Sequence, residues 1–170
     1  YLFPDTYFVP DTFTDAAMYD LMSSTFEEKL LPLKTRIAAH QLTEEEIIIL
    51  ASIIEREANT PESMGLVSSV LQNRLTIDMP LQADASIEYI LDKPLSELTP
   101  EDLEIESPYN TYLYTGLPPT PIGNPGLTAI ESVIEPAKSN YFYYITDADG
   151  VFHYAETFAE HKANIARYLR

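Results

Sequence analysis

The most continuous apolar stretch of the chain covers residues 47–54 and reads Ile-Ile-Ile-Leu-Ala-Ser-Ile-Ile. Thr43 and Glu46 precede it with the spacing of a capping box, so a helix is predicted to begin directly after Thr43. The stretch ends at the charged sequence Glu55-Arg-Glu57. A helix that is apolar around most of its surface lies in the interior of a domain. The pattern therefore predicts a buried helix over residues 44–57.

The rest of the chain alternates between helical and strand patterns. Amphipathic spacing and start signals predict helices at residues 15–30, 61–75, 86–91 and 127–134, a short one that begins at Thr99, and a last one from Thr157 to about residue 169. Strand patterns occur at residues 1–9, with turns at Pro4 and Pro10, and at residues 141–146 and 151–154, which are predicted to pair as a hairpin. Residues 33–40 resemble a charged connector. Helices in mixed order with a small antiparallel sheet indicate an α+β fold.

A long segment at residues 107–126 has neither the helical nor the strand periodicity, and it is rich in proline, tyrosine, asparagine and glycine. A loop of this length inside a compact domain usually has a functional role. Disorder is the alternative, but several large apolar side chains in the segment favour a packed loop. We expect this loop and the end of the 44–57 helix to line a cleft.

The composition fits one folded domain without a metal or cofactor. The chain has 170 residues, of which 45% are hydrophobic, and it contains no apolar stretch long enough to span a membrane. It has no cysteine, and its three histidines are not at metal-ligand spacing, so we expect no metal site and no cofactor. The sequence Asp147-Ala-Asp-Gly150 lacks the other ligands of a calcium loop and is predicted to be the hairpin turn.

The formal net charge of −17 argues against nucleic acid as a partner, because such a charge repels phosphates. We therefore expect a ligand that is uncharged over much of its length or that is held by local contacts. The twelve tyrosines suit stacking against sugar rings, and they suit half-buried strands equally well.

Glu55 is the candidate for proton transfer. At about 100° per residue it falls within roughly 40° of Ile48 and Ala51 on the helical wheel, so it is predicted to continue the buried face. Glu57 is predicted to lie on nearly the opposite side. Burial raises the pKa of a carboxyl group because desolvation disfavours the anion, and a general acid that works near neutral pH needs a raised pKa. The alternative is that Glu55 turns to solvent or pairs with a neighbouring arginine.

Seven motifs together resemble one known family. They are Tyr-Leu-Phe-Pro-Asp-Thr-Tyr at residues 1–7, Ala-Ser-Ile-Ile-Glu-Arg-Glu at 51–57, Asn-Arg-Leu at 73–75, Met-Pro-Leu-Gln-Ala-Asp at 79–84, Tyr-Asn-Thr-Tyr at 109–112, Gly-Leu-Pro-Pro at 116–119 and Pro-Ile-Gly-Asn-Pro-Gly at 121–126. In this order, over nearly the whole chain, they resemble the catalytic domain of the endolytic murein transglycosylases, the MltG or YceG-like family.

The resemblance implies an architecture and a location. Residues 1–170 would be a single catalytic domain, a helical domain with a small antiparallel sheet and a lysozyme-like active-site cleft. The transmembrane helix and LysM-like module that precede this domain in the family would be missing from the chain. The full-length protein would be membrane-anchored at the extracytoplasmic face of the bacterial inner membrane, with peptidoglycan glycan strands as its substrate and cell-wall synthases among its partners.

The resemblance also implies a reaction. Lytic transglycosylases cut the β-1,4 bond between N-acetylmuramic acid and N-acetylglucosamine without water and leave 1,6-anhydro ends, using one carboxyl group as acid and then as base. The first glutamate of the family's Ser-Ile-x-Glu-x-Glu motif corresponds to Glu55. The chain departs from the family after Gln82, where it has Asp84-Ala-Ser86 and the family often has Asp-Pro-Thr.

The resemblance suggests substrate-binding candidates as well, namely Asn73, Gln82, Asp84, Tyr109, Asn110 and Tyr112. Their amides suit N-acetyl groups, and the two tyrosines suit sugar rings. Asparagine also caps helices and turns, and the tyrosines also suit the packing of the loop. Two other functions stay open: a peptidoglycan-binding scaffold domain that does not cut glycan, and a hydrolase that uses two carboxylates, with Asp84 as the second.

Overall fold

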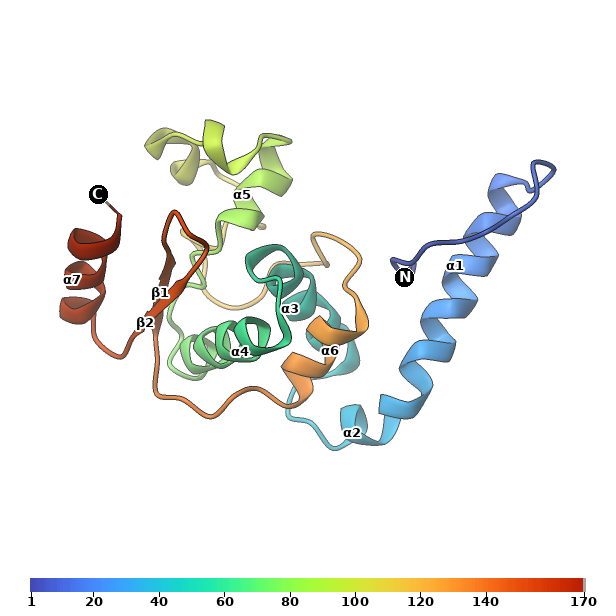
Figure 1. Ribbon diagram of the computed structural model, residues 1–170, viewed down its shortest axis with the longest axis horizontal. Coiled ribbons are helices and arrows are strands. Elements are labelled where there is room, and N and C mark those ends of the chain that lie inside the picture. The colour runs from blue at the N-terminus through green and yellow to red at the C-terminus, as the bar shows by residue number, and fades with distance from the viewer. Residues whose placement is uncertain (170) are drawn as a thin grey trace.

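The computed structural model describes residues 1–169, except for the side chain of Leu95. Figure 1 shows a helical body with one small sheet at its side. The helices are α1 (Asp15–Leu30), α2 (Lys34–Ala38), α3 (Glu44–Glu57), α4 (Pro61–Thr76), α5 (Asp84–Leu91), α6 (Leu127–Ile134) and α7 (Phe158–Tyr168), with the short 3-10 helices η1 (Leu31–Leu33), η2 (Leu95–Glu97) and η3 (Pro100–Glu104). The strands are β1 (Tyr143–Thr146) and β2 (Phe152–Ala155). The predicted α+β fold, helical with a small antiparallel sheet, is confirmed.

Helix α3 is the centre of the core. It packs against α4, α5 and α6, and Figure 1 shows α4 and α6 beside it in the middle of the molecule. No residue of 47–54 is more than 4% exposed. The predicted capping box is present, because the Thr43 side chain accepts from the Glu46 N–H while the Glu46 carboxylate accepts from the Thr43 N–H. The helix therefore begins where the sequence predicts and is buried along its middle.

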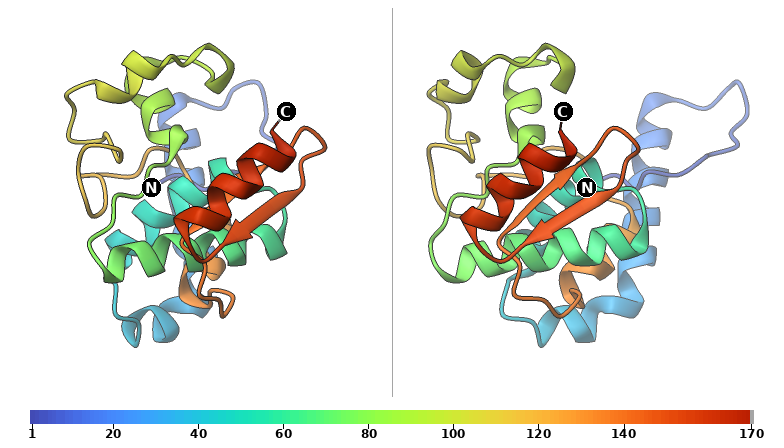
Figure 2. Two further views of the ribbon diagram at one scale, coloured as in Figure 1. Left: turned by 90° about the vertical axis from the view of Figure 1, so that its left-hand side faces the viewer. Right: turned by 60° about the vertical axis from the view of Figure 1, so that its left-hand side comes forward.

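The hairpin and the last helix form a second layer. β1 and β2 pair antiparallel with Tyr143 opposite Ala155 and Thr146 opposite Phe152. α7 packs against both strands, as Figure 2 shows, and β1 also contacts α4. The contact between β1 and α4 places the hairpin, and α7 with it, beside the helical body.

Two predictions for the N-terminal part are wrong. Residues 1–9 form no strand. A strand needs a partner strand to satisfy its backbone, and here the Phe3 N–H instead donates to the carbonyl of Met22 in α1, at 3.1 Å. Residues 33–40, predicted as a connector, instead contain α2 and the end of η1. Figure 1 shows that α1 extends away from the rest of the molecule.

The segment at residues 107–126 forms neither helix nor strand, as predicted, and hydrogen bonds hold it against the body. Thr111 accepts hydrogen bonds from the backbone N–H groups of Gln82 and Ala83, at 2.9 and 3.0 Å. The Ile122 N–H donates to the Ser52 hydroxyl of α3, at 3.0 Å. These contacts place the loop beside α3 and the start of α5. Among the described residues, every helix is too short or too polar to cross a lipid bilayer.

Candidate active site

Two adjacent cavities lie between the helical body and the hairpin. The larger, of about 580 Å³, is lined by residues of α3, α4, α5, β1 and α7 together with the loop residues Gln82 and Tyr112. The smaller, of about 220 Å³, is lined by the end of α3, residues 58 and 59, and the hairpin. Both are lined by Arg56, Glu57 and Thr146. We call the two together the hairpin cleft, with Glu57 where they meet.

Glu57 is a partly buried carboxyl group of this cleft. Its Oε2 accepts a hydrogen bond from the Tyr144 hydroxyl of β1, at 2.8 Å, and its Oε1 accepts a longer one from the Ala85 N–H of α5, at 3.4 Å. Burial raises the pKa of Glu57, and the charge of Asp84 adds to this, while the two hydrogen bonds oppose it. A carboxyl group with a raised pKa, in a cleft, can hold a proton for a leaving oxygen.

The predicted position of Glu55 on the buried face is wrong. Its side chain is exposed and lines the smaller cavity, where Oε2 accepts from the Gly126 N–H at 2.9 Å. Gly126 is the last residue of the 107–126 loop and precedes α6, so Glu55 lies beside the loop as expected. Of the two alternatives for Glu55, exposure to solvent is what the structure has. Arg56 pairs with Glu88 instead, at 2.7 Å.

The physical reason lies in the packing of α3. Its middle is buried on every side, so the helical wheel does not tell which side stays covered where the core ends. After Ile54 the covering comes from β1 and the start of α5, and these lie over Glu57. Of the two glutamates, Glu57 is therefore the one whose pKa is raised by burial, as a general acid requires.

Three of the six predicted substrate-binding residues line the larger cavity. The Tyr112 hydroxyl donates a hydrogen bond to Asp84 Oδ1, and burial together with this carboxylate raises the pKa of Tyr112 well above its ordinary value. Gln82 is exposed and has a left-handed backbone, with φ of 50°. The fold thus brings Gln82, Asp84 and Tyr112 together with Glu57.

The other three predicted residues are not among those that line the hairpin cleft. The Asn73 amide donates to the carbonyls of Ser139 and Tyr141, at 3.1 and 2.9 Å. The Asn110 side chain is fully buried, and its amide donates to two backbone carbonyls of the chain before it. The Tyr109 hydroxyl lies 2.7 Å from that of Thr120. These are the hydrogen bonds of amides and hydroxyls that hold loops in place.

Three further residues of the cleft are absent from the sequence-based candidates: Arg74, Tyr144 and His161. Arg74 is 6% exposed, although it is charged. A signal for its burial exists in the sequence, because Arg74 follows Val70 and Leu71 at helical spacing and so continues the apolar stripe of α4. Tyr144 and His161 carry no comparable local signal.

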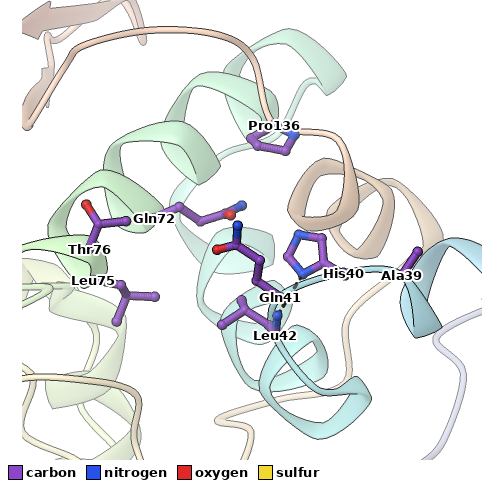
Figure 3. Close-up of a pocket in the computed structure, with 8 residues that line it drawn as sticks. All are labelled: Ala39, His40, Gln41, Leu42, Gln72, Leu75, Thr76 and Pro136. Atoms are coloured by element: carbon purple, nitrogen blue, oxygen red, sulfur yellow. Dashed lines mark hydrogen bonds between the residues drawn. The ribbon is translucent and has the colours of Figure 1, made fainter.

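Another cavity, of about 510 Å³, lies between the α2–α3 connection and α4, and Figure 3 shows its lining. Its side chains are apolar groups, amides, a hydroxyl and His40, whose Nδ1 accepts from the Leu42 N–H at 3.1 Å. No carboxyl group lines it, and it shares no lining residue with the hairpin cleft. The hairpin cleft brings Glu57 together with three of the predicted substrate-binding residues, and it is therefore the candidate active site. Within residues 1–169, no group of three or more metal-ligating side chains is present.

Known proteins resemble this chain over nearly its whole length. A protein of Streptococcus pneumoniae named endolytic murein transglycosylase is 36% identical over 99% of the chain and 32% of its own length, and one of the same name from Bacillus subtilis is 33% identical over 99% of the chain and 47% of its own length. The crystal structure of a YceG-like protein from Listeria monocytogenes superposes with a TM-score of 0.88 at 33% identity and covers 96% of this chain and 54% of that one.

The chain spans about a third to a half of the length of these two named relatives. The family model described as the YceG-like family matches residues 1–167. The seven motifs, the fold and these matches agree, and the chain belongs to the YceG-like family.

Proposed function

We propose that this chain is the catalytic part of an endolytic murein transglycosylase, which cuts the bond between N-acetylmuramic acid and N-acetylglucosamine inside glycan strands and leaves 1,6-anhydro ends. The observation that carries the proposal is the partly buried Glu57, whose pKa is raised and which lies where the two cavities of the hairpin cleft meet. The names of the similar proteins support the same reaction.

Glu57 is the proton donor of this reaction. Its protonated carboxyl group gives its proton to the glycosidic oxygen, and the C1–O bond breaks. The resulting carboxylate then takes a proton from the C6 hydroxyl, whose oxygen attacks C1 to close the anhydro ring. Tyr144 donates to Oε2, so the anion that forms between the two steps keeps a hydrogen bond.

The neighbouring groups have separate roles. Gln82 and Tyr112 line the cavity and offer an amide and an aromatic ring to the sugar next to the cleaved bond. Asp84 is held by the Tyr112 hydroxyl and keeps the proton on Glu57 by its charge. Glu55 lies in the adjacent smaller cavity and is the acid that the family motif indicates, so it is the second candidate for the donor.

The experiment uses purified protein and uncrosslinked glycan strands, with the new ends identified by mass. Wild-type protein is expected to produce internal 1,6-anhydro ends, with or without chelator. Glu57→Gln is expected to abolish cleavage while it retains glycan binding. Glu55→Gln tests the second candidate on the same helix turn and is expected to retain cleavage.

Each other outcome changes a specific assignment. Loss of cleavage in Glu55→Gln alone would identify Glu55 as the proton donor. Reducing ends in place of anhydro ends would identify a hydrolase with Asp84 as the second carboxylate. Binding without any cleavage by the wild type would identify the scaffold function, which no feature of the cleft favours.

For the full-length protein, the family implies an extracytoplasmic site of action at the bacterial inner membrane, with an anchor and a LysM-like module before this domain. Cell-wall synthases are proposed as partners on the same ground. Membrane fractionation of the uncut protein, and co-purification with synthases from membranes, test these two points. Recovery in the soluble fraction would contradict the anchor.

A further inference from the structure

Arg74 is a buried cation at the wall of the hairpin cleft without an acidic partner. It is 6% exposed, and no ion pair within residues 1–169 includes it. Its Nε donates to the Phe142 carbonyl at 2.6 Å, and its Nη1 donates to the Leu81 carbonyl at 2.7 Å. A buried guanidinium is normally paired with an anion, because carbonyl dipoles alone replace only part of its hydration.

The Nη2 group of Arg74 is the unused part of this guanidinium. The four hydrogen bonds of Arg74 start from Nε and Nη1, and none with a described residue starts from Nη2. Since Arg74 lines the larger cavity, its Nη2 donors are available to a ligand there. The charge of Glu57 favours the charged form of Arg74, but the proposed reaction needs Glu57 protonated, and this contribution is then absent.

His161 of α7 lies beside Arg74 on the same wall. Its Nδ1 is buried and has no partner among the described residues, which is uncommon for a buried polar atom. Its ring stacks on that of Tyr143, with centroids 5.0 Å apart, and the Arg74 guanidinium lies over the same ring at 5.3 Å. Burial and the charge of Arg74 lower the pKa of His161. Two side chains from distant segments, Arg74 and His161, thus line the same cavity.

We propose that Arg74 and His161 form a subsite for a carboxylate of the substrate, carried on the branch of muramic acid. A guanidinium edge has the geometry to bind a carboxylate, and the chain has a net charge of −17, so an acidic group needs a local cation to bind here. The acids of the same cavity are already engaged, since Asp84 accepts from Tyr112, Glu57 accepts from Tyr144, and Glu88 pairs with Arg56. This inference rests on the proposed function for its substrate class.

The carboxylate has two sources in such a strand: the lactyl group of muramic acid itself and the acidic residues of the attached peptide. Equilibrium binding is measured in the Glu57→Gln variant. This variant is expected not to cleave the ligand, and its neutral glutamine side chain resembles the protonated Glu57. The ligands are glycan strands that carry peptides, strands freed of peptide that expose the lactyl carboxylate, the same strands with that carboxylate amidated, and a chitin oligosaccharide without lactyl groups.

The acidic strands are expected to bind about tenfold to a hundredfold more tightly than the amidated strand or chitin, as for one charge-assisted hydrogen-bonded pair. Tighter binding of the peptide-free acidic strand assigns the lactyl carboxylate, and tighter binding of the peptide-bearing strand alone assigns the peptide. His161→Phe keeps the stack on Tyr143. This variant is expected to weaken the binding of acidic strands several-fold without changing the affinity for chitin. Arg74→Gln is expected to remove the preference for acidic strands.

The controls separate this subsite from a structural effect. His153→Phe is the matched variant, because His153 stacks on Tyr168 outside the cleft lining and should leave all four affinities unchanged. If Arg74→Gln does not fold, the affinities of His161→Phe for acidic strands and for chitin test the subsite on their own. Equal binding of acidic and neutral strands by the Glu57→Gln protein, or an equal loss for acidic strands and chitin in His161→Phe, would overturn the subsite and leave the proposed function intact. Failure of every glycan to bind would refute both.

Discussion

The hydrogen bond from Tyr144 to Glu57 gives a quantitative test of the proposed acid. Tyr144→Phe removes only the hydroxyl, because the ring contacts with Phe152 and Tyr154, at centroid distances of 6.0 and 6.5 Å, are kept. The bond is 2.8 Å long and part-buried, and burial raises the pKa of its acceptor. A hydrogen bond to a charged group contributes about 1.5–3 kcal/mol, and one between neutral groups about 1 kcal/mol.

The cost of Tyr144→Phe therefore depends on the charge of Glu57. At acidic pH, where Glu57 is protonated, the variant should lose about 1 kcal/mol of unfolding free energy, and above the pKa of Glu57 about 1.5–3 kcal/mol. In a Glu57→Gln background the loss should stay near 1 kcal/mol at every pH, since the acceptor is neutral. Because the bond lowers the pKa of Glu57, its removal should raise that pKa and move the alkaline limb of the cleavage profile to higher pH.

Urea unfolding followed by far-ultraviolet circular dichroism measures these differences, since the chain has no tryptophan to report by fluorescence. The four proteins of the double-mutant cycle are compared from acidic to neutral pH. The same loss for Tyr144→Phe at every pH, or an equal loss in the Glu57→Gln background at neutral pH, would show that Glu57 carries no charge that Tyr144 stabilises. The assignment of Glu57 as the titrating acid would then be refuted.

Three further predictions concern pH, loop packing and charge. Because the pKa of Glu57 is raised above its ordinary 4.5, folding loses stability as pH rises from 4.5 through the folded pKa, so Glu57→Gln should be as stable as wild type or more stable at neutral pH in urea unfolding; a less stable variant would contradict this. Asn110→Ala should lower the unfolding free energy by about 2 kcal/mol, because the backbone carbonyls of Leu103 and Ile105 lose the donor that the buried Asn110 side chain supplies, and a change below about 0.5 kcal/mol would refute the role of Asn110 in holding the loop. Moderate salt should speed association with anionic glycan strands by screening the charge of −17, as measured by stopped flow, whereas slower association would indicate that the attraction at Arg74 controls encounter.

Local sequence determined the helices with little error. The predicted starts of α3, α4 and α7 agree with the structure because caps act within one turn of the helix: the Thr43, Thr60 and Thr157 capping boxes satisfy N–H groups only three residues away. The hairpin and the irregular 107–126 segment were likewise predictable, since alternation and turn residues are local properties. The family motif that suggests the catalytic acid lies at the end of α3, which lines the hairpin cleft.

Tertiary structure alone decided which glutamate of that helix end is partly buried and which is exposed. The helical wheel predicted that Glu55 lies on the buried face. The groups that cover Glu57 belong to residues 85 and 144, which are distant in sequence, and the periodicity of α3 contains no information about them. The strand predicted at residues 1–9 does not form for the same reason, because pairing depends on a partner elsewhere in the chain. The pKa of a carboxyl group and the pairing of a strand are both set by what lies across space from them, whereas a helix satisfies its backbone within its own turns.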